Sequence, residues 1–286
     1  DPLRRQRQMC IRDSAYVGES DVYFSTESFE EYGKLSKRKL EDMLSGARID
    51  IDLDKKNPAD FVLWKKDTEG LKWDSPWGPG RPGWHIECSA MSMDALGETF
   101  DIHGGGSDLK FPHHENEIAQ SECVTGKEFA KVWMHTGSLR IDEQKMSKSL
   151  KNFITIKEAL NESSSEVLRF FLISSHYRSP LNYSDEGLKE AKNSLDRLYN
   201  SLQELSYETD EHIPSEYSEK FHDAMQDDFN SPSAISVLFE MVKQINILKK
   251  EDQLTHANTL ASELISLSNI LGILLDNPEE YFLSLI

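Results

Sequence analysis

Two lysines, a methionine and two serines make up the short segment Lys145-Met146-Ser147-Lys148-Ser149. Two ammonium groups in a small loop that also carries hydroxyls are suited to clamp the phosphates of a nucleotide. A solvated turn rich in lysine and serine is the plain alternative. Chance would place this pentapeptide in only about a few of every ten thousand chains of this length and composition. We therefore interpret the segment as a loop that binds ATP.

A second group of residues has the chemistry of a metal site. Zinc prefers thiolate, imidazole and carboxylate ligands in a tetrahedral arrangement. His113 and Glu117 stand four residues apart, so a helix would place them on one face, and Cys88 would add a third ligand from the end of a distant strand. His114 lies three residues from Glu117, so the spacing leaves open which histidine is the ligand. A solvated helix face explains the same residues equally well.

A glycine run followed by aspartate, Gly104-Gly105-Gly106-Ser107-Asp108, is a third candidate. Such a run suits a loop that closes on a ribose, with the Asp108 carboxylate accepting hydroxyl hydrogens, although it is often only a turn before a helix. Position 109 is Leu, so the run does not match the dinucleotide fingerprint, and this disfavours a nicotinamide-dependent oxidoreductase.

The elements that must position these residues can be outlined from the pattern. A strand is expected at residues 22–24, a charged helix around 36–44, and tight turns in the glycine- and proline-rich stretch from Trp77 to Gly106. A helix is expected over 113–123. A strand over 132–141 would deliver the Lys145–Ser149 loop, because α/β proteins present ligand-binding groups at strand ends.

After Asn152 the pattern becomes helical. Thr155 and Glu158 have the spacing of a capping box, and Asn230-Ser231-Pro232 has the composition of a helix start. Three apolar stripes follow at helical spacing, which is typical of the core of a helical bundle and needs no cofactor. They are Leu188, Ala191, Leu195, Leu198, Leu202 and Leu205; then Ala234, Leu238, Met241, Ile245 and Leu248; then Leu254, Ala257, Ala261, Leu264, Leu267, Leu271 and Leu274.

Composition limits the class of protein. A chain of 286 residues with 38% hydrophobic and 29% charged residues predicts a soluble globular protein of roughly two domains. No stretch has the length of a membrane span or the form of a signal peptide, and three scattered cysteines fit a reducing compartment, so we expect a cytoplasmic protein with no membrane partner. The net charge of −18 disfavours a general nucleic-acid binder and a DNA partner. Any RNA contact would need a local basic surface.

Four blocks of sequence, in this order, resemble cysteinyl-tRNA synthetase, a class I aminoacyl-tRNA synthetase. The likeness extends from about Ala15 to the C-terminus. The blocks are Gly83 to Met91 (GWHIECSAM), Phe100 to Leu109 (FDIHGGGSDL), Phe111 to Glu117 (FPHHENE) and Lys145 to Ser149 (KMSKS).

The resemblance implies a fold of α/β plus all-α class: the second half of a Rossmann-like nucleotide-binding domain with part of its insertion, followed by a helical bundle. Residues 1–14, with four arginines, would be a non-native leader or, alternatively, a native basic arm. Residues 15–80 would be the connective insertion. Residues 81–150 would be the second half of the catalytic domain with the lysine loop, and residues 151–286 the stem-contact region and bundle.

The resemblance also assigns the metal and the amino-acid pocket. Cys88, His113 and Glu117 correspond to three of the family's four zinc ligands, and the fourth, a cysteine near the N-terminus, has no counterpart here. Trp84 would floor the amino-acid pocket and His85 would line it, with ordinary core packing as the alternative. A zinc ligand set explains how cysteine is told from serine, because a thiol binds zinc as thiolate and a hydroxyl is a far poorer ligand.

The resemblance also implies the residues that bind ATP. Lys148 would contact ATP most directly and Lys145 would assist, so these two carry the catalytic role by stabilising the departing pyrophosphate. The ATP-binding residues implied are Lys145, Met146, Ser147, Lys148, Ser149 and Asp108.

The function implied is ATP-dependent ligation of cysteine to tRNA(Cys) through cysteinyl-adenylate, with cysteine, tRNA(Cys) and ATP with Mg²⁺ as substrates. The family's His-Ile-Gly-His signature and its C-terminal anticodon domain have no match, so we expect a fragment that is inactive alone. Two alternatives stay open: a cysteine ligase that acts on an amino sugar, and a catalytically silent zinc-binding module. The long bundle favours tRNA over the sugar, and the intact lysine loop argues against the silent module.

Overall fold

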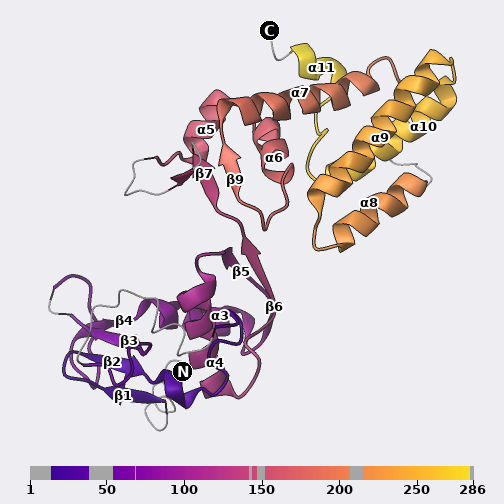
Figure 1. The fold of residues 1–286 in the computed structure, drawn as a ribbon. Coiled ribbons are helices and arrows are strands. Elements are labelled where there is room, and N and C mark those ends of the chain that lie inside the picture. Colours follow the sequence, from indigo (N-terminus) through magenta and orange to yellow (C-terminus); the bar gives the residue numbers. More distant parts are fainter. Residues whose placement is uncertain are drawn as a thin grey trace. The chain divides into compact units, whose positions relative to one another are not determined.

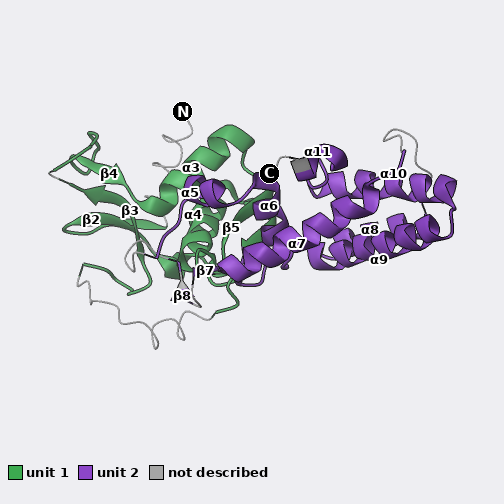
Figure 2. Ribbon diagram, turned by 90° about the horizontal axis from the view of Figure 1, so that it is seen from above, with its two compact units in different colours: residues 1–135 green, residues 136–286 purple. Residues whose placement is uncertain are grey.

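The chain consists of two compact units, residues 1–135 and 136–286, coloured separately in Figure 2. The computed structural model describes residues 14–38, 54–67, 69–141, 144–146, 152–206 and 215–283. The expected helix at 36–44 lies mostly outside these residues, and residues 36–38 form a turn and coil. The predicted leader likewise lies outside them, except for its last residue, Ser14.

A four-stranded antiparallel sheet forms one part of the first unit (Figure 1). The strand expected at 22–24 is confirmed, since these three residues are buried and belong to β2, which pairs with β3. The strands, in sheet order, are β1 (Ala15–Val17), β2 (Asp21–Phe24), β3 (Phe61–Lys66) and β4 (Gly80–Pro82).

The glycine-rich stretch leads into a helix. Helix α3 (Trp84–Leu96) begins directly after β4, and the Gly83 amide donates to the Leu63 carbonyl at 2.9 Å. A Cβ on Gly83 would lie 2.0 Å from the Val62 carbonyl oxygen, so only glycine lets the chain turn this close to β3. Cys88 therefore lies on a helix, and the prediction that it sits at a strand end is wrong.

The Gly104–Gly106 run is also placed differently from the expectation. It forms the end of strand β5 (Phe100–Gly106), which pairs with β6 (Ala130–Thr136), and is not a loop. The reason is close packing, because a Cβ on Gly105 would lie 2.7 Å from Cε1 of His114. A short π-helical turn η2 (Lys110–His114) then leads into α4 (Glu115–Thr125), which starts two residues later than predicted.

The single strand predicted over 132–141 is two strands, β6 and β7 (Leu139–Ile141), separated at Gly137. The Gly137 amide donates to the Tyr177 carbonyl at 2.7 Å, and a Cβ there would lie 2.1 Å from the Ser179 carbonyl oxygen. In the second unit β7 is the centre of a small sheet, antiparallel to β8 (Gln144–Lys145) and parallel to β9 (Leu181–Tyr183).

Helices make up the rest of the second unit. The capping box of Thr155 and Glu158 is confirmed at α5, and the Asn230 side chain caps α9 as expected. The structure adds α6, α8 and α11 here, and α3 in the first unit, none of which the periodicity singled out. The helices are α5 (Ile156–Glu162), α6 (Ser165–Ile173), α7 (Asp185–Leu202), α8 (Glu216–Gln226), α9 (Ser231–Lys250), α10 (Leu254–Ile270) and α11 (Pro278–Leu283).

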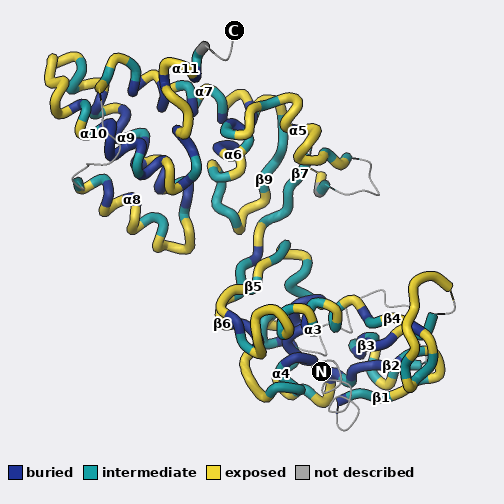
Figure 3. Tube along the Cα trace, turned by 180° about the vertical axis from the view of Figure 1, so that it is seen from behind, coloured by how far each residue is buried: buried dark blue, intermediate teal, exposed yellow. Residues whose placement is uncertain are grey.

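The apolar stripes form the core of this unit. Figure 3 shows the buried positions of α9 and α10 on the sides where these two helices pack together. Leu195, Leu238 and Leu264 are fully buried there, while Leu271 and Leu274 remain buried although α10 ends at Ile270. The α/β plus all-α class is thus confirmed. Within the described ranges, no helix has the length and apolar character that crossing a membrane would require.

Candidate active site

The first turns of α3 place three chemically useful side chains together. Trp84 and Cys88 are four residues apart and share a face, with His85 beside them. Trp84 is 57% exposed, and its ring stacks on that of His113, with 4.1 Å between ring centroids. His85 Nδ1 lies 2.7 Å from His113 Nδ1, so one of these two nitrogens donates to the other.

Helix α4 and the turn before it bring the remaining candidate ligands to Cys88. His113 Nε2 lies 2.6 Å from Glu117 Oε1, and the Glu117 side chain is almost fully buried. One ligand atom from each of Cys88, His113 and Glu117 lies within 4.8 Å of the other two. The structure therefore brings all three predicted ligands together, and a sulfur, a nitrogen and an oxygen donor at this spacing fit a zinc ion.

A second set of histidines lies on the other side of Glu117. His103 Nε2 contacts Glu117 Oε2 at 3.0 Å, and His103, His114 and Glu117 also lie close enough to hold a metal. His114 Nδ1 in turn lies 2.9 Å from His135 Nε2. The structure places His113 in a group with Cys88 and His114 in a group with His103, and both groups share Glu117.

The electrostatics of the cluster favour an ionised Glu117 carboxylate and a neutral His85. Burial would raise the pKa of Glu117, but the imidazoles of His103 and His113 outweigh it and lower that pKa to about 2. Burial lowers the pKa of His85 to about 4, with the neighbouring His113 adding to the effect. Burial, followed by the Glu117 and Glu87 carboxylates, raises the pKa of the Cys88 thiol. A cation bound beside Cys88 would reverse this last effect.

Sequence reasoning missed the histidines at 103, 114 and 135 as a group. A signal was present, because five of the nine histidines lie between residues 85 and 135. They come from α3, β5, η2 and β6, and only the packing of these elements shows that their rings meet.

A cavity of about 610 Å³ adjoins this cluster within the first unit. Trp84 and His85, the two predicted pocket residues, both line it, together with Phe61, Phe111 and Asn116. Its walls are mostly aromatic and aliphatic, with a few polar groups, as in sites for small molecules.

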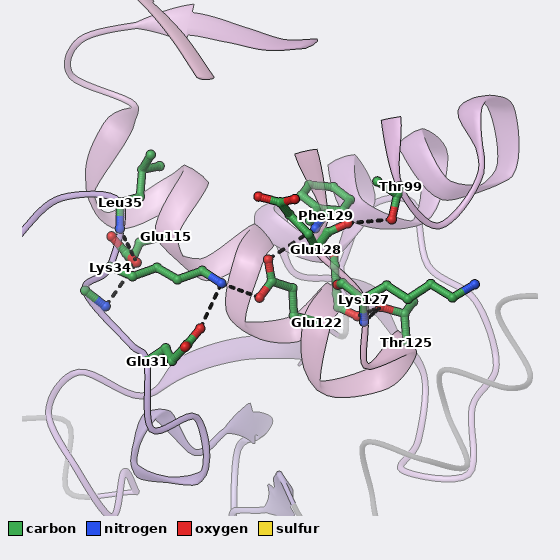
Figure 4. Close-up of polar contacts among 12 residues, drawn as sticks. Glu31, Lys34, Leu35, Thr99, Glu115, Glu122, Thr125, Lys127, Glu128 and Phe129 are labelled. Atoms are coloured by element: carbon green, nitrogen blue, oxygen red, sulfur yellow. Dashed lines mark hydrogen bonds and ion pairs between the residues drawn. The ribbon is translucent and has the colours of Figure 1, made fainter. Parts of the chain in front are cut away.

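Polar contacts join residues 32–36 to helix α4 (Figure 4). The buried Glu115 carboxylate accepts hydrogen bonds from the amides of Gly33, Leu35 and Ser36, at 3.0, 3.2 and 2.8 Å. Lys34 pairs with Glu122, which lies on the same face of α4 about two turns after Glu115. We call residues 32–36 the strap, and it holds the helix that carries Glu117.

The predicted nucleotide-binding residues are described only in part. Asp108 is exposed in the turn that follows β5. Lys145 ends β8, opposite Arg140, and the Met146 amide donates to the Leu139 carbonyl at 3.1 Å. Ser147, Lys148 and Ser149 lie outside the described residues.

A family model described as "tRNA synthetases class I (C) catalytic domain" matches residues 6–193, and one described as "DALR domain" matches residues 220–276. The fold and the motifs agree with this class. The chain belongs to the class I tRNA synthetases, in the family of that catalytic domain.

Among curated proteins, the chain is 56% identical over 280 residues to the cysteine–tRNA ligase of Hahella chejuensis, covering 96% of this chain and 60% of the relative. It is 55% identical over 269 residues to the cysteine–tRNA ligase of Coxiella burnetii, covering 93% of this chain and 58% of the relative. The resemblance read from the motifs is thereby confirmed. The chain spans about 60% of the length of these relatives.

Solved structures share the fold at low identity. Methionyl-tRNA synthetase of Mycobacterium tuberculosis, in complex with methionyl-adenylate, matches with a TM-score of 0.60 and 14% identity, over 92% of this chain and 62% of that one. A putative arginyl-tRNA synthetase of Campylobacter jejuni matches with a TM-score of 0.58 and 13% identity, over 96% and 61%. At this identity the matches show the fold of a class I catalytic domain and not the substrate.

Proposed function

We propose that the chain is part of a cysteine–tRNA ligase, which activates cysteine with ATP and transfers it to the 3′ end of tRNA(Cys) in the cytoplasm. The observation that carries this proposal is the cluster of Cys88, His113 and Glu117 beside the exposed face of Trp84. The names of relatives that are more than half identical support it.

The metal that fits the cluster is zinc, held by Cys88, His113 and Glu117. When bound, it supplies a Lewis acid that prefers the thiolate of cysteine to the hydroxyl of serine. A hydrophobic pocket of fixed size would separate two such similar side chains only about 10- to 200-fold. Trp84 and His85 then enclose the amino acid on the other side.

The reaction needs no protein nucleophile. The cysteine carboxylate attacks the α-phosphorus of ATP, the bond to the β-phosphate oxygen breaks, and pyrophosphate leaves with its Mg²⁺. Lys148 and Lys145 stabilise the negative charge that develops on the leaving group, and Asp108 contacts the adenylate. The terminal ribose hydroxyl of the tRNA then attacks the adenylate carbonyl, and AMP leaves.

Two other functions fit fewer observations. Ligation of cysteine to an amino sugar would use the same first step, but the relatives' names support tRNA as the acceptor. A catalytically silent zinc-binding module would not need the phosphate-binding segment Lys145–Ser149.

The proposal is tested with the full-length protein expressed from the complete gene. Cysteine should drive exchange of labelled pyrophosphate into ATP, serine should not, and Lys148→Ala should lower the exchange rate by about 10²-fold or more, as expected for loss of a group that stabilises transition-state charge. Lys189→Ala, an exposed lysine on α7, is the matched control. Absence of cysteine-dependent exchange in the wild-type protein would refute the proposal, and transfer of labelled cysteine to an amino sugar instead of tRNA would replace it.

A further inference from the structure

A buried polar pair joins the two helices that carry the candidate metal ligands. Ser89 of α3 is fully buried, and Gln120 of α4 is only 1% exposed. Ser89 follows Cys88 directly in the chain, and Gln120 lies about one helical turn after Glu117. We call Ser89 and Gln120 the bracket, and neither residue was singled out by the sequence.

The Gln120 side chain donates to two groups of α3 at once. Its Nε2 donates to the His85 carbonyl oxygen at 2.7 Å and also to Ser89 Oγ. The Ser89 hydroxyl in turn donates a long hydrogen bond, 3.5 Å, to the Glu117 carbonyl oxygen. Only the NH₂ side of an amide can donate to a carbonyl, so the orientation of the Gln120 amide is fixed. The bracket therefore holds α3 on both sides of Cys88.

Apolar contact between α3 and α4 is limited. Of the thirteen residues of α3, all of which the structure describes, Ser89 alone is buried. Ile86 contributes part of its side chain to the small apolar cluster that includes Ala119 of α4. Apolar contact is non-directional, whereas hydrogen bonds have preferred distances and angles. The hydrogen bonds of the bracket therefore fix the position of α3 against α4 at this point.

Stability alone does not explain a glutamine at position 120. Its Oε1 is buried and has no hydrogen-bond partner among the described residues. A buried acceptor without a partner destabilises the fold, so an apolar side chain of similar length would avoid this cost. What the glutamine adds is the fixed geometry that its NH₂ group imposes on α3.

We propose that Gln120, acting through Ser89 and the His85 carbonyl, is a positioning residue that sets the distance from Cys88 Sγ to the other metal ligands. This inference rests on the metal site of the proposed function. A zinc–sulfur bond is about 2.3 Å long, and groups in a functional site must be held within about 0.5 Å of their working positions. A small shift of α3 along α4 would therefore weaken the bond between the metal and the thiolate.

The first test is a Co²⁺ titration of Gln120→Met in this chain, with a competing chelator to measure affinity. Methionine has nearly the length of glutamine but no NH₂ group, so it fills the space without forming the bracket. We expect Co²⁺ affinity to fall about 10- to 100-fold, as it does when other residues around metal ligands are replaced. The sulfur-to-metal charge-transfer band should also shift in energy or lose intensity.

Ser121→Ala is the matched control, because it removes a buried hydroxyl from the next position of α4. That hydroxyl has no hydrogen-bond partner among the described residues. The control variant should bind Co²⁺ like the wild-type chain. Urea denaturation without metal checks the fold, and Gln120→Met should unfold at a urea concentration close to that of the wild-type chain.

A second variant tests whether the two bracket residues act together. Ser89→Ala should also weaken Co²⁺ binding, because it removes one of the two acceptors of Gln120. Residues that share a contact have non-additive effects. The double variant Ser89→Ala with Gln120→Met should therefore lose less affinity than the product of the two single effects. A full product would show that the two residues act independently and would overturn the bracket.

Wild-type affinity and an unchanged band in Gln120→Met would also overturn the proposal. An equal loss of affinity in Ser121→Ala would overturn it too, because any change in the packing of α4 would then have the same effect. A wild-type chain that binds no Co²⁺ would refute the metal site and the bracket together.

The full-length protein separates these results from the ligase proposal. In cysteine-dependent pyrophosphate exchange, Gln120→Met should raise the KM for cysteine and leave the KM for ATP unchanged. A smaller fraction of folded protein would instead lower the rate and change neither KM. Exchange by the wild-type protein with an unchanged KM for cysteine in Gln120→Met would support the ligase and refute the bracket. Failure of exchange in the wild-type protein would refute the ligase, and the Co²⁺ titration would still decide the bracket.

Discussion

At the scale of single residues, the site is defined by one buried carboxylate. Both oxygens of Glu117 face imidazoles, His113 on one side and His103 on the other, and Cys88 approaches from α3. A carboxylate this deeply buried is costly unless cations or donors satisfy it. The arrangement is therefore typical of a metal ligand set. His103 contacts the Glu117 carboxylate and His85 contacts His113, as residues around metal ligands usually do.

The buried histidines predict a pH dependence of stability. Burial is the main cause that lowers the pKa of His85 and of His114 to about 4, against 6.5 for the ordinary side chain. Between about pH 6.5 and pH 4 the unfolded chain binds more protons than the folded one, so the free energy of unfolding falls as the pH falls through this window. At pH 7 and above the contribution of both histidines is fully present.

The measurement is urea denaturation of the metal-free chain at pH 7.5 and pH 5. We expect the free energy of unfolding to drop by on the order of a few kcal/mol. His114→Gln should reduce that drop, whereas His222→Gln, an exposed histidine on α8, should leave it unchanged. Equal stability at both pH values would show that the histidines are not held neutral by burial.

At the scale of elements, the sequence predicted what depends on local periodicity. The apolar stripes identified α7, α9 and α10 because one face of each is buried along its length. Two predictions were wrong: residues 132–141 form two strands, and Gly104–Gly106 belong to a strand. Contacts between residues distant in sequence cause both differences, since Gly137 packs against Ser179 and Gly105 packs against His114. Helix α3 was missed because its apolar residues form no single stripe.

The strap yields a prediction about an element. Glu115 is fully buried and accepts hydrogen bonds from the amides of Gly33, Leu35 and Ser36. Glu115→Gln would turn an NH₂ group toward amides that need an acceptor, so we expect a loss of about 1–3 kcal/mol in the free energy of unfolding. Glu31→Gln removes only the exposed pairing with Lys34 and should cost about 0–1 kcal/mol.

Chemical denaturation of the two variants makes the comparison directly. If Glu115→Gln is no less stable than Glu31→Gln, the amide contacts of the strap do not stabilise the first unit. A fall in stability with Glu115→Gln alone would establish the strap as the support of α4.

At the scale of the whole molecule, the candidate metal cluster lies in the first compact unit, and the core of the helical bundle lies in the second. The four-part division read from the sequence stays a prediction, since the compact units divide at residue 135. Of the candidate site, the sequence predicted the group of Cys88, His113 and Glu117, which the structure brings together. The supporting histidines could not be predicted as a group, because they come from elements that only the packing of the fold brings together.

This separation predicts where a bound metal changes the dynamics. A metal that binds only the folded site stabilises that fold, so Zn²⁺ should slow amide hydrogen exchange in α3 and α4. The amides of α9 and α10 should exchange at unchanged rates. Mass-spectrometric hydrogen exchange with and without Zn²⁺ measures both regions at once, and equal protection throughout the chain, or none, would contradict the placement of the metal.

The most direct measurement of the central claim, that α3 and α4 bring Cys88, His113 and Glu117 together around one metal ion, is a titration with Co²⁺ followed by absorption. Co²⁺ adopts zinc sites and reports a thiolate ligand by a sulfur-to-metal charge-transfer band. The account predicts one Co²⁺ per chain with this band, its loss in Cys88→Ser, and its retention in Cys123→Ser, whose thiol packs beside the core around Phe24. An unchanged band in Cys88→Ser, or no band in the wild-type chain, would contradict it.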